Sequence, residues 1–125
     1  MQRIYQIVLL SCLMLAISVA FDTRPASAHA IIIESSPDVN ATLTGPAVPV
    51  DLHFNSRIDK KRSGLTLLNP DKTSQRLAIP VDGEADRITT IADGLAPGIY
   101  QIEWQVLSID GHITRGFIPF TVKAP

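Results

Sequence analysis

Residues 98–108, GIYQIEWQVLS, alternate apolar with polar side chains after a Pro97-Gly98 turn. Successive side chains of a β-strand point to opposite faces of the sheet, so alternation over this length predicts a strand with one buried face. That face carries the side chains of Tyr100, Ile102, Trp104 and Val106. Because a tryptophan supplies a large apolar surface, Trp104 is expected to centre the hydrophobic core.

The same alternation recurs along the chain after residue 30. Val48, Val50, Leu52 and Phe54 alternate with Pro49, Asp51, His53 and Asn55, so His53 is expected on the solvent side of its strand. No stretch keeps a 3.6-residue period for three turns, which argues against helices. The expected strands lie near residues 30–35, 47–55, 64–69, 75–81, 87–92, 98–108 and 115–123. Seven short strands predict an all-β fold, a small Greek-key β-barrel or sandwich.

The first 28 residues have the composition of a cleaved export signal. Arg3 precedes an apolar run over residues 4–21, and Ala26-Ser27-Ala28 has the small residues of a signal-peptidase site. The alternative is an uncleaved anchor helix, because about 20 apolar residues span a membrane. The cleavage site favours export, so we expect residues 1–28 to be a signal peptide and residues 29–125 to be one periplasmic domain.

The composition of residues 29–125 argues against several classes of function. Removing Arg3, Arg24 and Asp22 from the 11 basic and 12 acidic residues leaves nine and eleven, a formal charge of −2. This charge argues against nucleic acid as a partner. Cysteine and methionine occur only in the predicted leader, at positions 1, 12 and 14. The mature chain therefore has no disulfide and no sulfur ligand for a soft metal ion.

Cleavage after Ala28 would place His29 at a free N-terminus. The α-amino nitrogen and the ring Nδ1 of this residue can close a chelate ring on one metal ion. A terminal amine, with a pKa of about 8, deprotonates far more readily than a lysine. This ligand exists only after cleavage, because in the uncleaved chain the same nitrogen belongs to a peptide bond.

Residues 108–116, SIDGHITRG, contain a second pair of ligand-type side chains. Asp110 and His112 are separated by one glycine, and residues i and i+2 of an extended segment project to the same side. An Asp-x-His pair is weak evidence by itself, because a turn with an exposed histidine has the same pattern. The sequence contains no nucleophile–base pair, paired glutamates or phosphate-binding glycine loop, so it gives no support for an enzyme.

Three segments together resemble the CopC family of secreted copper-resistance and copper-binding proteins. They are the expected mature start HAIIIESSPDVNATL, the strand PVDLHFNSRI, and the strand and loop LAPGIYQIEWQVLSIDGHITRGFIPFTV. The most specific part is a Gly-x-Tyr-x-x-x-Trp pattern that ends at Trp104 and is followed by Ser108-x-Asp110-Gly111-His112. The resemblance implies a cupredoxin-like or immunoglobulin-like fold with one Cu(II) ion per chain.

The resemblance also implies the ligands, which are the amine and imidazole of His29, the imidazole of His112, and Asp110. Some members add a glutamate after the second strand, where this chain has Ser56, and others bind Cu(I) with a methionine-rich loop that this chain lacks. The chain is therefore identified as a Cu(II)-only member, and a set of nitrogen and oxygen donors agrees with that. His53 is not expected to be a ligand.

The function implied by the resemblance is copper homeostasis or resistance in the periplasm. A monomer would sequester Cu(II), or deliver it to a CopD-type inner-membrane transporter or another acceptor. The alternative is a copper-dependent oxidative enzyme, because such enzymes also use an N-terminal histidine chelate. A domain of 97 residues, which is 125 less the 28 of the leader, leaves little surface for a flat polysaccharide-binding face. We therefore do not expect an enzyme.

Overall fold

The computed structural model describes residues 2–7 and 29–125. Residues 2–7 form a short helix, and most of the predicted signal peptide, with its cleavage site, lies outside the described residues. Within the described ranges, no helix is long and apolar enough to cross a membrane. The strands are β1 (Ile32–Ser36), β2 (Ala41–Thr44), β3 (Val48–Phe54), β4 (Ile58–Leu68), β5 (Ser74–Leu77), β6 (Arg87–Ala92), β7 (Gly98–Ser108) and β8 (Ile113–Lys123).

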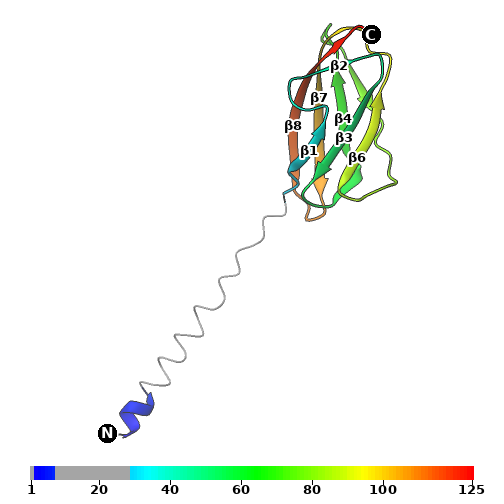
Figure 1. The fold of residues 1–125 in the computed structure, drawn as a ribbon. Helices are drawn as coiled ribbons and strands as arrows, with labels where there is room; N and C mark the ends of the chain where they lie inside the picture. The colour runs from blue at the N-terminus through cyan, green and yellow to red at the C-terminus, as the bar shows by residue number, and fades with distance from the viewer. Residues whose placement is uncertain (1, 8–28) are drawn as a thin grey trace.

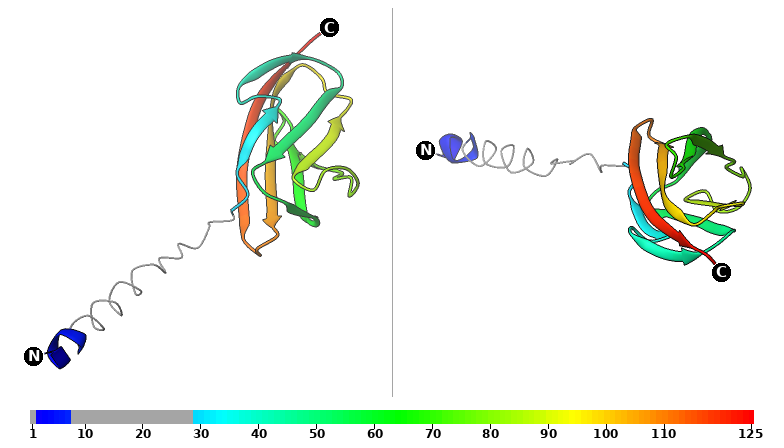
Figure 2. Two further views of the ribbon diagram at one scale, coloured as in Figure 1. Left: turned by 60° about the horizontal axis from the view of Figure 1, so that its bottom comes forward. Right: turned by 90° about the horizontal axis from the view of Figure 1, so that it is seen from above.

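The strands form two sheets packed face to face (Figures 1 and 2). One sheet has the order β1-β3-β6, and the other has the order β2-β8-β7-β4-β5. All neighbouring strands are antiparallel except β2, which runs parallel to β8. The predicted sandwich is therefore confirmed. A closed barrel is not formed, because the hydrogen-bonded ladders of the two sheets stay separate.

The core lies between the sheets and is built by the two strands in which alternation is clearest. In β3 and β7 every second residue is buried, including Val50, Leu52, Ile102 and Val106. The rings of Phe54 and Trp104 meet edge to face across the sandwich, with their centroids 5.6 Å apart. Trp104 is therefore a core residue, as expected from its position in the alternating pattern.

Two elements differ from the strands expected from the sequence. Residues 41–44 form β2, which was not predicted because its backbone pairs with β8 at Phe120–Lys123, far along the chain. β4 begins at Ile58, six residues before the predicted strand, and its pairing with β7 is interrupted between Asp59 and Gly64. The basic run Lys60-Lys61-Arg62 lies in this irregular part of β4.

Gly116 in β8 is required by the packing of Trp104. The two residues are partners in the β7–β8 ladder, and the indole lies over the glycine. A Cβ atom at position 116 would be 2.4 Å from Cζ2 of Trp104, and the three nearest atoms all belong to the indole. Because Trp104 is itself packed against Phe54, the ring cannot move away freely.

We expect Gly116→Ala to destabilise the domain by about 1–3 kcal/mol, because overpacking forces the indole from its position. The measurement is urea unfolding followed by the fluorescence of Trp104, the single tryptophan. Gly64→Ala is the matched control: its Cβ would meet only the guanidinium end of exposed Arg76, at 3.0 Å, so its effect should stay within about 1 kcal/mol. Equal losses in the two variants would contradict the packing argument.

Candidate metal centre

The turn between β7 and β8 is closed by backbone hydrogen bonds. The amide of Ser108 donates to the carbonyl of His112 at 2.8 Å, and the amide of Gly111 donates to the carbonyl of Ser108 at 2.9 Å. Gly111 has a φ of 90°, a left-handed conformation that glycine adopts without steric cost. The amide of Ile109 donates to the carbonyl of Arg57 at 3.2 Å, which ties the turn to the start of β4. The turn is therefore held from both sides.

Asp110 is held as a carboxylate within this turn. The hydroxyl of Ser108, which is buried, donates to Oδ1 of Asp110, and the amide of His112 donates to the same oxygen at 3.2 Å. These hydrogen bonds, with that of Ser108 the strongest influence, outweigh desolvation and lower the pKa of the Asp110 carboxyl to about 2. Asp110 is thus fully ionised at neutral pH.

The imidazole of His112 is oriented by Asp110. Its Nδ1 lies 2.9 Å from Oδ2 of Asp110. Since an ionised carboxylate can only accept a hydrogen bond, Nδ1 carries the hydrogen and Nε2 keeps a free lone pair. The side chain of His112 is 59% exposed, so this lone pair is accessible to a metal ion. A carboxylate bound to the far nitrogen of a metal-binding histidine is a common way to fix its tautomer.

His29 lies against His112. Their ring centroids are 4.5 Å apart and the ring planes meet at 75°. The two histidines are far apart in the sequence. They meet because the segment that leads into β1 lies at the same end of the sandwich as the β7–β8 turn (Figure 1). The predicted pair of imidazoles is therefore brought together by the fold.

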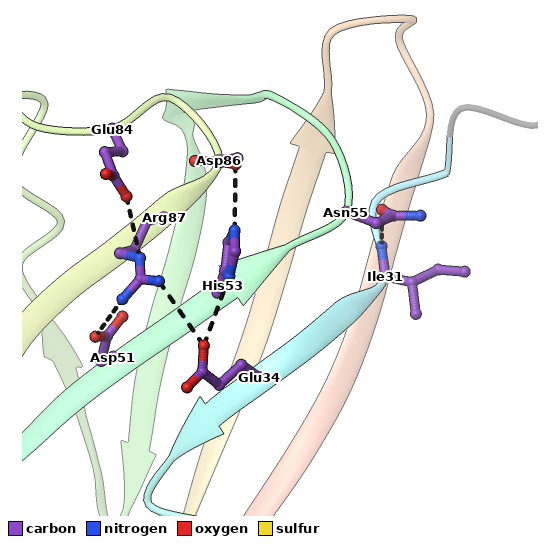
Figure 3. A network of polar contacts seen from close by, with 8 residues as sticks. All are labelled: Ile31, Glu34, Asp51, His53, Asn55, Glu84, Asp86 and Arg87. Atoms are coloured by element: carbon purple, nitrogen blue, oxygen red, sulfur yellow. Dashed lines mark hydrogen bonds and ion pairs between the residues drawn. The ribbon is translucent and has the colours of Figure 1, made fainter.

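Asn55 positions the segment that carries His29. Its side-chain Oδ1 accepts a hydrogen bond from the backbone amide of Ile31 at 2.8 Å (Figure 3). The backbone amide of Asn55 donates to the carbonyl of Ile31 at 2.9 Å. Ala30, which precedes Ile31, is fully buried. Sequence reasoning placed Asn55 only on a polar face. Its position directly after a buried strand, where an amide side chain can bond a neighbouring backbone, was the available signal.

Across residues 2–7 and 29–125, no group of three His, Cys, Asp or Glu side chains is arranged to hold a metal ion. One reason is that Oδ2 of Asp110 is directed at Nδ1 of His112 and not at open space. The backbone nitrogen of His29 is not a side-chain group, and in the uncleaved chain it is a peptide nitrogen. The side chains alone therefore supply two imidazoles and an orienting carboxylate.

His53 lies on the outer face of β3, as predicted, but it is held by carboxylates and is not free in solvent. Its Nε2 is 3.3 Å from Asp86 and its Nδ1 is 3.7 Å from Glu34, and the side chain is 26% exposed (Figure 3). Arg87, paired with Asp51 at 2.9 Å, extends the same network. Both ring nitrogens of His53 are thus directed at acidic partners.

Ser56 occupies the position at which a further acidic ligand was considered. Its hydroxyl is buried and has no hydrogen-bond partner among the described residues. The loop of residues 55–57 has no carboxylate to offer to the turn that holds Asp110 and His112. The candidate centre therefore consists of His29, Asp110 and His112, with Ser108 and Asn55 as the residues that position them.

Comparisons with known proteins agree with this fold and with the resemblance. The CopC domain model matches residues 32–123. Copper resistance protein C of Xanthomonas campestris pv. juglandis is 34% identical over 119 residues, which cover 88% of this chain and 91% of the relative. Protein YobA of Escherichia coli K12 is 32% identical over 99 residues, 77% of this chain and 80% of the relative. The crystal structure of CopC from Methylosinus trichosporium OB3b has a TM-score of 0.68 at 25% identity, covering 77% of this chain and 95% of that one. This chain therefore belongs to the CopC family.

Proposed function

We propose that this chain is a copper-binding protein of copper homeostasis, which holds one Cu(II) ion at the end of the sandwich. The observation that carries the proposal is the contact of His29 with His112, at 4.5 Å between ring centroids, beside a carboxylate that orients His112. Two imidazoles from distant parts of the chain meet at an accessible point. The relatives include a protein named copper resistance protein C.

The chemistry of the donors favours Cu(II). After cleavage before His29 the site offers two imidazoles, an amine and a carboxylate, all nitrogen or oxygen donors. Such ligands suit tetragonal Cu(II), and divalent copper has the highest affinity in the first-row series. Cu(I) prefers thiolates and thioethers, and the chain has its three sulfur residues at positions 1, 12 and 14, within the proposed leader.

Asp110 acts on copper chiefly through His112 in this proposal. Its Oδ2 accepts the Nδ1 hydrogen of the imidazole, which leaves Nε2 as the donor to the metal. Its Oδ1 is engaged by Ser108 and by the backbone of His112. A rotation of the carboxylate could add an oxygen to the metal, but the hydrogen bonds observed support the orienting role.

The amine of His29 links copper binding to export. We propose that residues 1–28 are removed as a signal peptide and that the domain acts as a monomer in the periplasm. There it would buffer Cu(II) or pass it to an acceptor such as a CopD-type inner-membrane transporter. The oxidative-enzyme alternative is not favoured, because the family match and the relative of stated function point to copper resistance.

The requirement for a free amine is tested by comparing a chain that begins at His29 with one that carries a single glycine ahead of it. Loss of a residue that only orients a ligand lowers metal affinity by about 10 to 100-fold. The extended chain should lose more Cu(II) affinity than that, because it loses a ligand. Cu(II) affinity and electron paramagnetic resonance of the bound ion are the measurements. A glycine added after Pro125 is the control. Identical affinity and spectrum for all three chains would show that the amine is not a ligand.

The preference for Cu(II) is tested on the chain that begins at His29. It should take up one equivalent of Cu(II), and it should take no Cu(I) from a chelator specific for that ion, because sulfur ligands are lacking. Isothermal titration gives the stoichiometry, and the absorbance of the Cu(I) chelator reports the competition. Tight uptake of Cu(I) would refute the assignment of the donor set.

Asp110→Ala should weaken Cu(II) binding by about 10 to 100-fold, because the imidazole of His112 loses the partner that fixes its tautomer. His53→Ala is the control, since that histidine faces Glu34 and Asp86, and it should leave the affinity unchanged. Both variants are to be compared by Cu(II) competition at one pH, after urea unfolding has shown that each is folded. Equal losses of affinity would contradict the separation of the two histidine clusters.

A further inference from the structure

A hollow of about 410 Å³ opens on the outer face of the five-stranded sheet, over β4, β7 and β8. Its position follows from the ladder, in which Thr66, Glu103 and Phe117 lie side by side on the face opposite the core. None of the three candidate copper ligands lines it. The hollow is therefore a feature separate from the metal centre.

The absence of a side chain at Gly64 shapes one side of the hollow. Gly64 follows the interrupted pairing of β4, and a Cβ atom there would lie 3.0 Å from Nη2 of Arg76, so the guanidinium lies over the glycine. Gly116 and Trp104 also border the hollow, but the space at Gly116 is on the core face and is filled by the indole of Trp104.

The charges around the hollow are mostly positive. Its lining includes Lys61, Arg62, Arg76 and Arg115, and its one acidic residue is Glu103. Residues 29–125 hold nine basic and eleven acidic residues, so four of the nine cations of a net acidic domain gather at one place. The outer face of the other sheet carries instead the carboxylate network around His53 and Arg87 (Figure 3).

Few of these cations are neutralised by the protein. Arg62 pairs with Asp59 at 3.5 Å, and Arg115 donates through Nε to Gln105 at 2.7 Å, which leaves its terminal nitrogens available. Lys61 and Arg76 form no ion pair with any described residue. Like charges brought together repel each other, and a bound anion would offset that repulsion.

We infer that this hollow binds a small organic polycarboxylate. The planar fork of an arginine matches a carboxylate with two parallel hydrogen bonds, and Arg76 and Arg115 both reach the hollow. Phe117, which is 61% exposed, supplies apolar surface for the carbon skeleton. The volume lies at the low end of the range of small-molecule sites, about 300–1,000 Å³. Inorganic phosphate would use the cations but not the ring of Phe117.

Citrate is the probe for this inference, titrated into the metal-free chain that begins at His29 at constant ionic strength. Trp104 is the single tryptophan and lines the hollow, so its fluorescence should change with saturation, and isothermal titration should give one site. Phosphate should bind at least tenfold more weakly. Equal affinity for phosphate would overturn the assignment to carboxylates, and a signal without saturation would overturn the site.

Arg76→Gln and Arg115→Gln should each weaken citrate binding at least tenfold. Lys123→Gln is the matched control, because it removes the same charge from an exposed position outside the hollow. His112→Ala should keep the full citrate affinity, which separates this site from the copper centre. Thermal unfolding of each variant verifies the fold. Equal effects of Arg76→Gln and Lys123→Gln, or a loss of citrate binding in His112→Ala, would refute the proposal.

Discussion

The antiparallel pairing of β7 with β8 is the contact on which the rest of the structure depends. It runs without interruption from Gly98↔Val122 to Leu107↔Ile113. One face of this hairpin supplies Trp104 and its neighbours to the core, and the other face forms part of the cationic hollow. The turn that ends the hairpin carries Asp110 and His112. A shift of register by one residue would turn the core side chains to solvent. Core packing therefore fixes the register of the hairpin, and with it the turn that carries Asp110 and His112.

The candidate metal centre joins the two sheets. His112 lies in the turn between β7 and β8 of the five-stranded sheet. His29 lies two residues before Ile31, which is bonded to Asn55 just after β3 of the three-stranded sheet. The local turn orders one half through Ser108 and Gly111, and hydrogen bonds between distant backbone segments order the other. In the proposed function, a copper ion at this end would therefore be bound between two rigid elements, with little chain entropy left to lose.

Charge is distributed unevenly over this small domain. The outer face of β1, β3 and β6 holds a network in which Arg87 and His53 are surrounded by carboxylates. The outer face of β4, β7 and β8 holds the hollow with four cations and one acid. The candidate copper ligands lie at one end, away from the middle of either face. Sites for a metal ion and for an anion can thus coexist without competing for the same side chains.

The sequence by itself determined the features that arise between near neighbours in the chain. Alternation in residues 48–54 and 98–108 predicted the central strands. The contact of Asp110 with His112 was also predicted, but the two residues lie in a tight turn and not in the extended segment that was expected. Only the tertiary structure decided that β2 pairs with β8, that the sheets form an open sandwich, and that Asn55 holds Ile31. These contacts join segments that are distant in sequence, so no pattern among neighbouring residues could predict them.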